Sequence, residues 1–345
     1  MATWYIGADV DSKMTEVAAE NGRQVKRFRV PTTIPALREV LASLPGRQYL
    51  TFEEGPMAQW LYRNLKACVT ELIVCDPRRN RLITHDGDKS DAIDAGKLAE
   101  LLRGRHLRSV YHSDDDGRVQ LKEWVSLYHD RVHDAVRQVN KIRARCRMHG
   151  LRPGRGALRN EGIWERWLAT LGAHPVVGQL RLLWMGLSVN RRQSRMARTV
   201  LTQLGGKEPV VQAWQALPGI GLVRAVTVLA SLDTPWRFAQ PKKLWKYCGV
   251  GLQRTASGSD RHGRPRPGRL RLAYQVNRRL KDAVVGGALS AIHQGRNVFA
   301  EYYQDRLGKG MHAGNARHAV ARKLLTVMWG LWKNGSRFDE AWIRP

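Results

Sequence analysis

Four acidic side chains lie in short, distinctive patterns within the first 95 residues. Asp9 lies in WYIGADV, Glu53 in YLTFEEG, and Asp91 and Asp94 in KSDAIDAGKLAELL. Carboxylate oxygens are the ligands that Mg²⁺ and Mn²⁺ prefer in proteins. Two such ions can activate a nucleophile and stabilise a leaving oxygen at a phosphate. We therefore expect the four acids to converge on a site for Mg²⁺ or Mn²⁺.

Each of the first two acids has a neighbour that could take its place. Asp11 lies two residues beyond Asp9, and Glu54 adjoins Glu53. We favour Asp9 because it follows the apolar strand pattern directly, and Glu53 because TFE closes a strand before Glu54-Gly-Pro turns away. A single Asp at a strand end or helix start can also be a structural cap. The combination of four acids, rather than any one of them, favours the metal site.

The elements around the acids predict a mixed sheet covered by helices. Asp9 and Glu53 come at the ends of β-type apolar runs, Asn21-Gly22 is a hairpin signal, and Asp91 and Asp94 lie on one helical face. The patterns predict strands at 3–10, 16–20, 24–30, 48–52 and 70–75, and helices at 34–44, 57–66 and 91–102. Strands followed by helices are typical of an α/β domain.

The rest of the chain has helical periodicity. Residues 119–147 and parts of 164–204 predict two long helices with a break at LRPGRG, which could form a helical hairpin or a coiled-coil arm. Strict heptads are not sustained. Further helices are predicted at 222–232, 272–294 and 315–333. We therefore predict an α/β domain at 1–112, a helical arm at 113–207 and a mainly helical domain at 208–345.

The charge is distributed unevenly along the chain. The net charge is +28; residues 1–112 carry 17 Lys/Arg and 14 Asp/Glu, whereas residues 113–345 carry 41 and 16. Such an excess favours a polyanionic partner, DNA or RNA. The four cysteines form no CxxC pair, and no apolar run is long enough to cross a membrane. We expect a soluble cytoplasmic protein that makes no membrane contact and joins the nucleoid when it acts.

Two glycine-containing segments in the last region could contact phosphate. In LPGIG, Gly219 and Gly221 could present backbone N–H groups to a phosphate, or could simply form a tight turn. The segment RTASGSDRHGRPRPGRLRLAYQ has almost no core-forming residues before Leu270. By itself it predicts a basic loop that binds phosphate without specificity, through Arg254, Arg261, Arg264, Arg266 and Arg269.

Together these motifs resemble a known family over essentially the whole chain. The four acids, LPGIG at 217–221 and ASGSDRHG at 256–263 are similar to those of the DEDD insertion-sequence transposases, the pilin-invertase-like recombinases also known as bridge-RNA-guided serine-assisted recombinases. IGADVDSK is similar to the family's strand-end "GID" motif, which supports Asp9. KSDAIDAGKLAE matches the last two acids nearly residue for residue. The resemblance implies an RNase H/RuvC-like domain, a coiled-coil linker and a Tnp domain.

The resemblance also implies a mechanism and partners. A serine in an SGS context attacks DNA in this family and becomes covalently attached to it. Here that serine is Ser257, with Ser259 as the rival. The acids would then act as a metal-binding partner of the serine. The family recognises donor and target DNA through a structured guide (bridge) RNA, and assembles as dimers or tetramers whose sites combine different subunits.

Two other functions remain open from the residues alone. A metal-dependent nuclease of the RuvC-like, junction-cleaving type would use the four acids with water and would not need Ser257. A non-catalytic nucleic-acid-binding protein would use the acids as caps. A metal-dependent covalent protein–DNA adduct would distinguish the recombinase from both.

Overall fold

The chain folds into two compact units, Met1–Asp115 and Asp116–Pro345. The structure, a computed structural model, describes residues 2–80, 90–255 and 269–342. The first unit corresponds to the predicted α/β region. The predicted arm at 113–207, apart from residues 113–115, and the predicted domain at 208–345 both fall within the second unit, so their separation into two domains stays a prediction.

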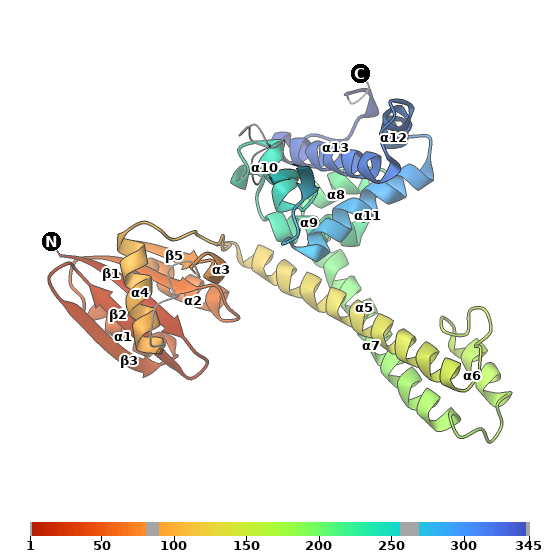
Figure 1. The fold of residues 1–345 in the computed structure, drawn as a ribbon, viewed down its shortest axis with the longest axis horizontal. Helices are drawn as coiled ribbons and strands as arrows, with labels where there is room; N and C mark the ends of the chain where they lie inside the picture. Colours follow the sequence, from red (N-terminus) through yellow and green to blue (C-terminus); the bar gives the residue numbers. More distant parts are fainter. Residues whose placement is uncertain (1, 81–89, 256–268, 343–345) are drawn as a thin grey trace, which may run out of the picture. The chain divides into compact units, whose positions relative to one another are not determined.

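The first unit is built on a five-stranded mixed sheet of order β3-β2-β1-β4-β5 (Figure 1). Its strands are β1 (Thr3–Val10), β2 (Met14–Glu20), β3 (Val25–Pro31), β4 (Arg47–Glu53) and β5 (Glu71–Cys75). β1, β2 and β3 pair antiparallel, whereas β1, β4 and β5 pair parallel. The predicted mixed sheet is confirmed.

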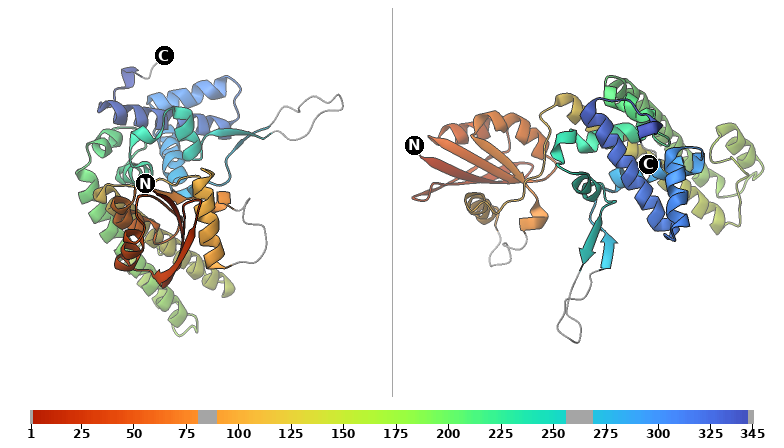
Figure 2. Two further views of the ribbon diagram at one scale, coloured as in Figure 1. Left: turned by 90° about the vertical axis from the view of Figure 1, so that its left-hand side faces the viewer. Right: turned by 90° about the horizontal axis from the view of Figure 1, so that it is seen from above.

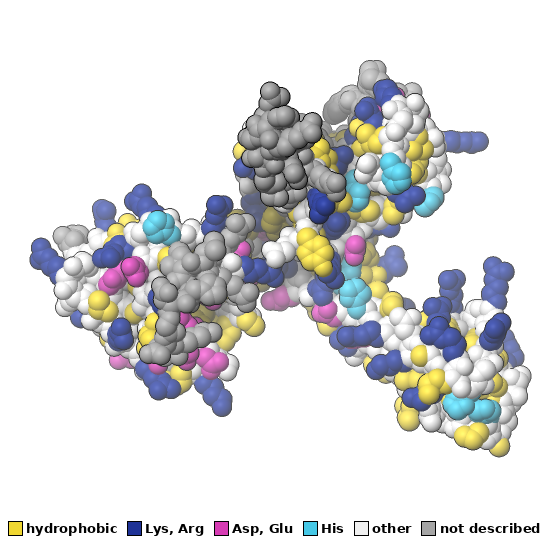
Figure 3. Space-filling view, in the orientation of Figure 1, with side chains coloured by type: hydrophobic (Ala, Val, Ile, Leu, Met, Phe, Trp, Pro, Cys, Tyr) yellow, Lys and Arg dark blue, Asp and Glu magenta, His cyan; other side chains and the backbone are white. Residues whose placement is uncertain are grey.

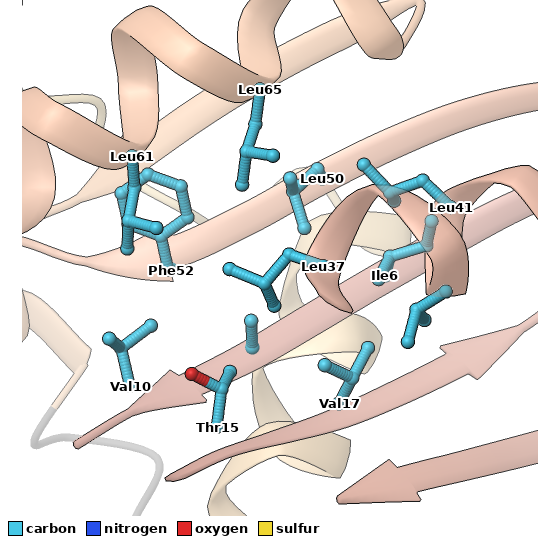
Figure 4. Close-up of a pocket in the computed structure, with 12 residues that line it drawn as sticks. Ile6, Val10, Thr15, Val17, Leu37, Leu41, Leu50, Phe52, Leu61 and Leu65 are labelled. Carbon is cyan, nitrogen blue, oxygen red and sulfur yellow. The ribbon is translucent and has the colours of Figure 1, made fainter. Parts of the chain in front are cut away.

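Helices cover both faces of this sheet. The helices are α1 (Ile34–Ala42), α2 (Ala58–Leu65), α3 (Pro77–Asn80) and α4 (Asp91–Arg103). Apolar side chains of β1 and β4 form a core with α1 and α2. Figure 4 shows Leu37 and Leu61 of these helices lying over Phe52, around a void of only about 20 Å³. The opposite face packs against α4.

A single glycine sets the distance between α4 and the sheet. A β-carbon on Gly7 would lie 2.2 Å from the carbonyl oxygen of Ala95 and 2.5 Å from the amide nitrogen of Ala99. Real β-carbons do not approach backbone atoms so closely, so glycine is required here. The backbones of β1 and α4 are therefore in direct contact, which fixes the helix on the sheet.

The second unit begins with two long helices. These are α5 (Asp116–Met148) and α7 (Val177–Gly206), which pack along each other, with α6 (Glu161–Ala169) between them in sequence. A small core lies around α6, where the rings of Trp164 and Trp184 stack with centroids 4.8 Å apart. The two predicted long helices are confirmed; their coiled-coil character stays a prediction.

The remainder of the second unit is a helical core. It contains α8 (Pro209–Gln215), α9 (Leu222–Leu232), α10 (Pro241–Tyr247), α11 (Arg278–Gln294), α12 (Val298–Gly308) and α13 (Ala313–Asn334). These helices share one hydrophobic core with residues of α5 and α7. No helix in the described ranges is long and apolar enough to span a membrane.

The structure corrects the predicted helix at 272–294. Leu272 belongs to β7 (Arg269–Leu272), which pairs antiparallel with β6 (Leu252–Thr255), and the helix begins only at Arg278. Figure 2 shows these two strands side by side. We call this pair of strands the ribbon. It was not predicted because its apolar residues Leu252 and Leu270 are exposed rather than directed into a core.

Candidate functional site

Asp9 and Glu53 lie on neighbouring strands at the same edge of the sheet. β1 and β4 are parallel, and their register pairs Ala8 with Phe52, so Asp9 and Glu53 are the next residue on each strand. Ala8 and Phe52 belong to the core with α1 and α2. Because side chains alternate along a strand, Asp9 and Glu53 are directed to the opposite face, which α4 covers.

The direction of α4 places its first turn at the same edge. Arg103, at the end of α4, pairs with Glu20 at 3.2 Å between Nε and Oε1. Glu20 is the register partner of Tyr5, near the start of β1. The end of α4 therefore lies near the start of β1. The two elements run antiparallel, and the start of α4 lies toward the end of β1 that carries Asp9.

Asp91 and Asp94 continue the sheet-facing side of α4. They precede the buried Ala95 and Leu98 by four residues each, which is one turn along the same helical face. Ser90 is the N-cap, because its hydroxyl accepts a hydrogen bond from the N–H of Ile93 at 3.3 Å. The capping role considered for Asp91 is therefore filled by Ser90.

The two rival acids have structural partners. The carboxylate of Asp11 accepts hydrogen bonds from the N–H of Lys13 at 3.2 Å and the hydroxyl of Ser12 at 3.4 Å. Hydrogen bonds from the backbone of Ser12 and, second, from the backbone of Lys13 hold the pKa of Asp11 below its usual value. Asp11 thus belongs to the turn between β1 and β2. This supports Asp9 as the site residue, which stays a prediction.

Glu54 is bound to a buried histidine that the sequence analysis does not identify. The Nε2 atom of His112 lies 2.7 Å from Oε2 of Glu54, and its Nδ1 atom lies 2.8 Å from Oε1 of Gln59. Gln59 donates its amide N–H to the carbonyl oxygen of Ser113 at 3.0 Å. Glu54 therefore anchors the chain at the end of β4, which supports Glu53 as the site residue. His112 lies in no motif, so no sequence signal could have revealed this contact.

The structure brings the four acids to one edge and one face of the sheet but does not close them into a metal-binding cluster. Within residues 2–80, 90–255 and 269–342, no group of three or more His, Cys, Asp or Glu side chains is arranged to hold a metal ion. Carboxylates at close range repel one another unless a cation lies between them. An all-carboxylate donor set and a shared edge fit Mg²⁺ or Mn²⁺ in their chemistry.

The two glycines of LPGIG differ in role. Gly219 has φ +80°, and a β-carbon there would lie 2.2 Å from the carbonyl oxygen of Gly287 in α11. Its own carbonyl accepts a hydrogen bond from Nη1 of Arg224 at 2.7 Å. Gly219 therefore forms a tight, packed turn. Gly221 is the N-cap of α9 and offers no side-chain cap, and a β-carbon there would meet nothing within 4 Å, so it remains the candidate for a phosphate contact.

The predicted serine loop lies largely outside the described residues. The structure does not describe five of its named residues: Ser257, Ser259, Arg261, Arg264 and Arg266. Arg254 lies in β6 and Arg269 begins β7, where it is the register partner of Thr255. The pairing of β6 with β7 thus places Thr255 and Arg269, the residues that flank the segment 256–268, opposite each other.

Two family models match the chain. The model DEDD_Tnp_IS110, described as "Transposase", matches residues 6–147, and the model described as "Transposase IS116/IS110/IS902 family" matches residues 211–304. The chain is also similar to the protein named "Putative transposase y4qE" of Sinorhizobium fredii, with 26% identity over 281 residues, 78% of this chain and 68% of that protein. The first model covers all four acids, and the second covers LPGIG and the ribbon.

Proposed function

We propose that the chain is a transposase of the IS110 family, an enzyme that acts on DNA, and that it is a site-specific recombinase of an insertion sequence. It would cut and rejoin DNA strands with the acids of the first unit and a serine of the second. The observation that carries this proposal is the position of Asp9, Glu53, Asp91 and Asp94 at one edge of the sheet.

The four acids would hold the metal ion. Asp9 and Glu53 would contribute oxygens from adjacent strand ends, and Asp91 and Asp94 from the first turn of α4. A bound Mg²⁺ or Mn²⁺ supplies Lewis-acid stabilisation of charge on phosphate oxygens and favours deprotonation of a nearby hydroxyl. Glu54 and Asp11 would support this edge through their contacts with His112 and Lys13 rather than bind the ion themselves.

Ser257 would be the nucleophile, with Ser259 as the alternative. Its Oγ atom would form a bond to the phosphorus of DNA while the bond from phosphorus to the 3′ oxygen breaks. The serine proton leaves to a base, and the departing oxygen takes up a proton to become a 3′ hydroxyl. The product is a DNA 5′-phosphate esterified to the serine. Five arginines of this segment would offset phosphate charge: Arg254, Arg261, Arg264, Arg266 and Arg269.

A structured guide RNA and further subunits complete the proposal. Residues 113–345 carry 41 Lys/Arg against 16 Asp/Glu, more positive charge than a short DNA site requires. We propose that this surface binds donor DNA, target DNA and a guide (bridge) RNA, and that the protein acts as a homodimer or tetramer. Sequencing of RNA that co-purifies with the protein should identify a discrete species encoded beside the gene. Full recombination by RNase-treated protein without added RNA would exclude guidance.

The serine assignment is tested with two single variants. Ser257→Ala should lose the covalent protein–DNA adduct while retaining nucleic-acid binding, because one hydroxyl contributes little to a strongly basic surface. Ser259→Ala should retain the adduct. The reverse result would move the nucleophile by two residues. Metal-dependent cleavage by both variants without any adduct would select the junction-nuclease function.

A further inference from the structure

Among the described side chains of the second unit, Trp236 is a tryptophan that the fold leaves exposed to solvent. The side chain of Trp236 is 71% exposed, whereas Trp164 and Trp214 are fully buried. A large aromatic surface left in water is unfavourable, and an exposed aromatic held in place is a feature of binding surfaces.

The backbone that carries Trp236 is held rigidly. The hydroxyl of Thr234 accepts a hydrogen bond from the N–H of Trp236 at 3.4 Å, and Pro235 fixes the turn between them. The carbonyl oxygen of Pro235 accepts a hydrogen bond from the indole N–H of Trp329 in α13 at 2.9 Å. The backbone turn that carries the indole of Trp236 is therefore preorganised.

One cationic side chain lies against this indole, and another lies against a second exposed ring. Nζ of Lys333 lies 4.9 Å from the ring centroid of Trp236 and 4.1 Å from that of Trp329. The guanidinium of Arg237 lies 5.0 Å from the ring centroid of Tyr247, which is 40% exposed. Arg237 is itself fixed, because its Nη1 donates hydrogen bonds to the carbonyl oxygens of Ser231 and Leu232.

The sequence around these rings is strongly basic. Residues 235–247 contain four Lys/Arg and no Asp/Glu, and Lys242, Lys243 and Lys246 are exposed on α10. We call the group Trp236, Arg237, Lys242, Lys243, Lys246, Tyr247 and Lys333 the aromatic-basic patch. Protein interfaces are depleted in Lys, whereas surfaces that bind single-stranded nucleic acid combine positive charge with stacking aromatics.

We propose that the aromatic-basic patch binds an unpaired nucleotide segment, with a base stacked on Trp236 and flanking phosphates against the lysines of α10. Unpaired DNA and unpaired RNA share this chemistry. The inference rests on the proposed function insofar as the partner is a nucleic acid, but the patch is distinct from the four acids and from the predicted serine loop.

The test is equilibrium binding of the full chain to three probes of equal length: oligo(dT), oligo(U) and a blunt DNA duplex. Trp236→Ala should weaken binding of the single strands about tenfold or more. Binding of the duplex should change less than twofold. Trp236→Phe should bind the single strands nearly as tightly as the wild type, because it keeps an aromatic ring on the same turn. Trp60→Ala, at a half-exposed tryptophan of the first unit, is the matched control and should change nothing.

A second measurement needs no variant. Ultraviolet cross-linking of wild-type protein to 5-bromouridine or 5-bromodeoxyuridine oligonucleotides, followed by peptide mass spectrometry, should place adducts on Trp236. The stronger probe, oligo(dT) or oligo(U), identifies whether DNA or RNA is the source. The proposal would be overturned if Trp236→Ala weakened the binding of duplex and of single strands equally. It would also be overturned if cross-links formed only at residues outside the aromatic-basic patch.

The outcomes separate the patch from the proposed function. Wild-type protein that binds duplex but neither single strand would overturn the patch and leave the recombinase proposal intact. Protein that binds none of the probes would overturn both. A Trp236→Ala variant that loses only self-association would assign the surface to a protein partner and overturn the inference.

Discussion

The two units differ in charge and in how they hold their functional residues. Met1–Asp115 carries 17 Lys/Arg and 16 Asp/Glu, whereas Asp116–Pro345 carries 41 and 14. On the face shown in Figure 3, acidic side chains are concentrated on the first unit, while Lys and Arg side chains lie on both units. The excess positive charge, which favours binding of phosphate, therefore lies in the second unit, while the unit that carries the four acids is nearly neutral.

The largest expected effect comes from the acids themselves. Asp91→Asn or Asp94→Asn keeps the size of each side chain but removes the charge that a divalent cation needs. Each should lower recombination by about a hundredfold or more, since loss of a group that merely supports a metal ligand already costs about tenfold to a hundredfold. Thermal unfolding should change little. Recombination is measured by the yield of joined product from matched donor and target DNA.

Glu100→Gln is the control for these variants, because Glu100 lies exposed on the same helix. It should recombine like the wild type. Full activity of both Asp91→Asn and Asp94→Asn would refute the assignment of α4 to the site.

The next largest effect separates the units as binding surfaces. Residues 1–115 alone should bind duplex DNA at least about a hundredfold more weakly than residues 116–345, because phosphate contacts dominate affinity. The second unit should also show a much steeper fall of log affinity with log salt. A salt titration by fluorescence anisotropy measures both. Equal affinities and equal salt dependences would refute the prediction that the second unit carries most of the affinity for DNA.

A smaller effect tests how the first unit places α4. Gly7→Ala should lower the free energy of unfolding by about 3 kcal/mol, because its β-carbon would meet backbone atoms of Ala95 and Ala99 that cannot move aside cheaply. Gly96→Ala, on α4 itself, meets nothing within 4 Å and should raise stability by about 0.5–1 kcal/mol. Denaturant unfolding of the two variants gives the comparison, and similar stabilities would contradict the close contact of α4 with β1.

The smallest effect concerns a histidine in the second unit. Nε2 of His129 lies 3.0 Å from the hydroxyl of Thr227, which donates its own proton to the carbonyl oxygen of Val223. Desolvation lowers the pKa of His129, and the positive charge of Arg279 acts in the same direction. Because the folded pKa lies below the unfolded value, the unfolded state takes up more protons as the pH falls below about 6.5.

This histidine therefore contributes stability that is present at neutral pH and lost in acid. His129→Gln should show a smaller loss of unfolding free energy between pH 7.5 and pH 5 than the wild type. Denaturant unfolding at both pH values measures this difference. An equal or larger loss in the variant would show that His129 is not held neutral. The other titratable groups near it, which are common to both proteins, are His133, Asp130 and Asp282.

Local sequence patterns predicted most of the strands and helices of the first unit, but not the contacts between residues that are far apart in the sequence. The apolar runs around Asp9 and Glu53 predicted β1 and β4, because side chains buried on a sheet leave a clear sequence signal. The direction of α4 depends on contacts such as that between Arg103 and Glu20, 83 residues apart, and no pattern encodes it. The link from His112 to Glu54 escaped for the same reason.

The second unit was harder to predict because several of its elements bury few apolar side chains and therefore lack a periodic sequence pattern. β6 and β7 pair without a buried face, so their sequences lack the alternation that marks a strand. α12 was missed because its buried residues are only Val298, Phe299 and Ala300, all in its first turn. The exposure of Trp236 could not be predicted either, because Trp236 lies in the three-residue turn Pro235–Arg237, which is too short to show a periodic pattern.

The most direct test of the account is to trap the reaction on DNA. Full-length protein, its co-purified RNA and end-labelled donor and target DNA are incubated with Mg²⁺ and separated on a denaturing gel. The account predicts a protein–DNA adduct that requires Mg²⁺, is lost in Ser257→Ala and in Asp9→Asn, and yields a Ser257 peptide esterified to a DNA 5′ phosphate. Strand cleavage in wild-type protein with no adduct, or an adduct that survives in Asp9→Asn, would contradict it.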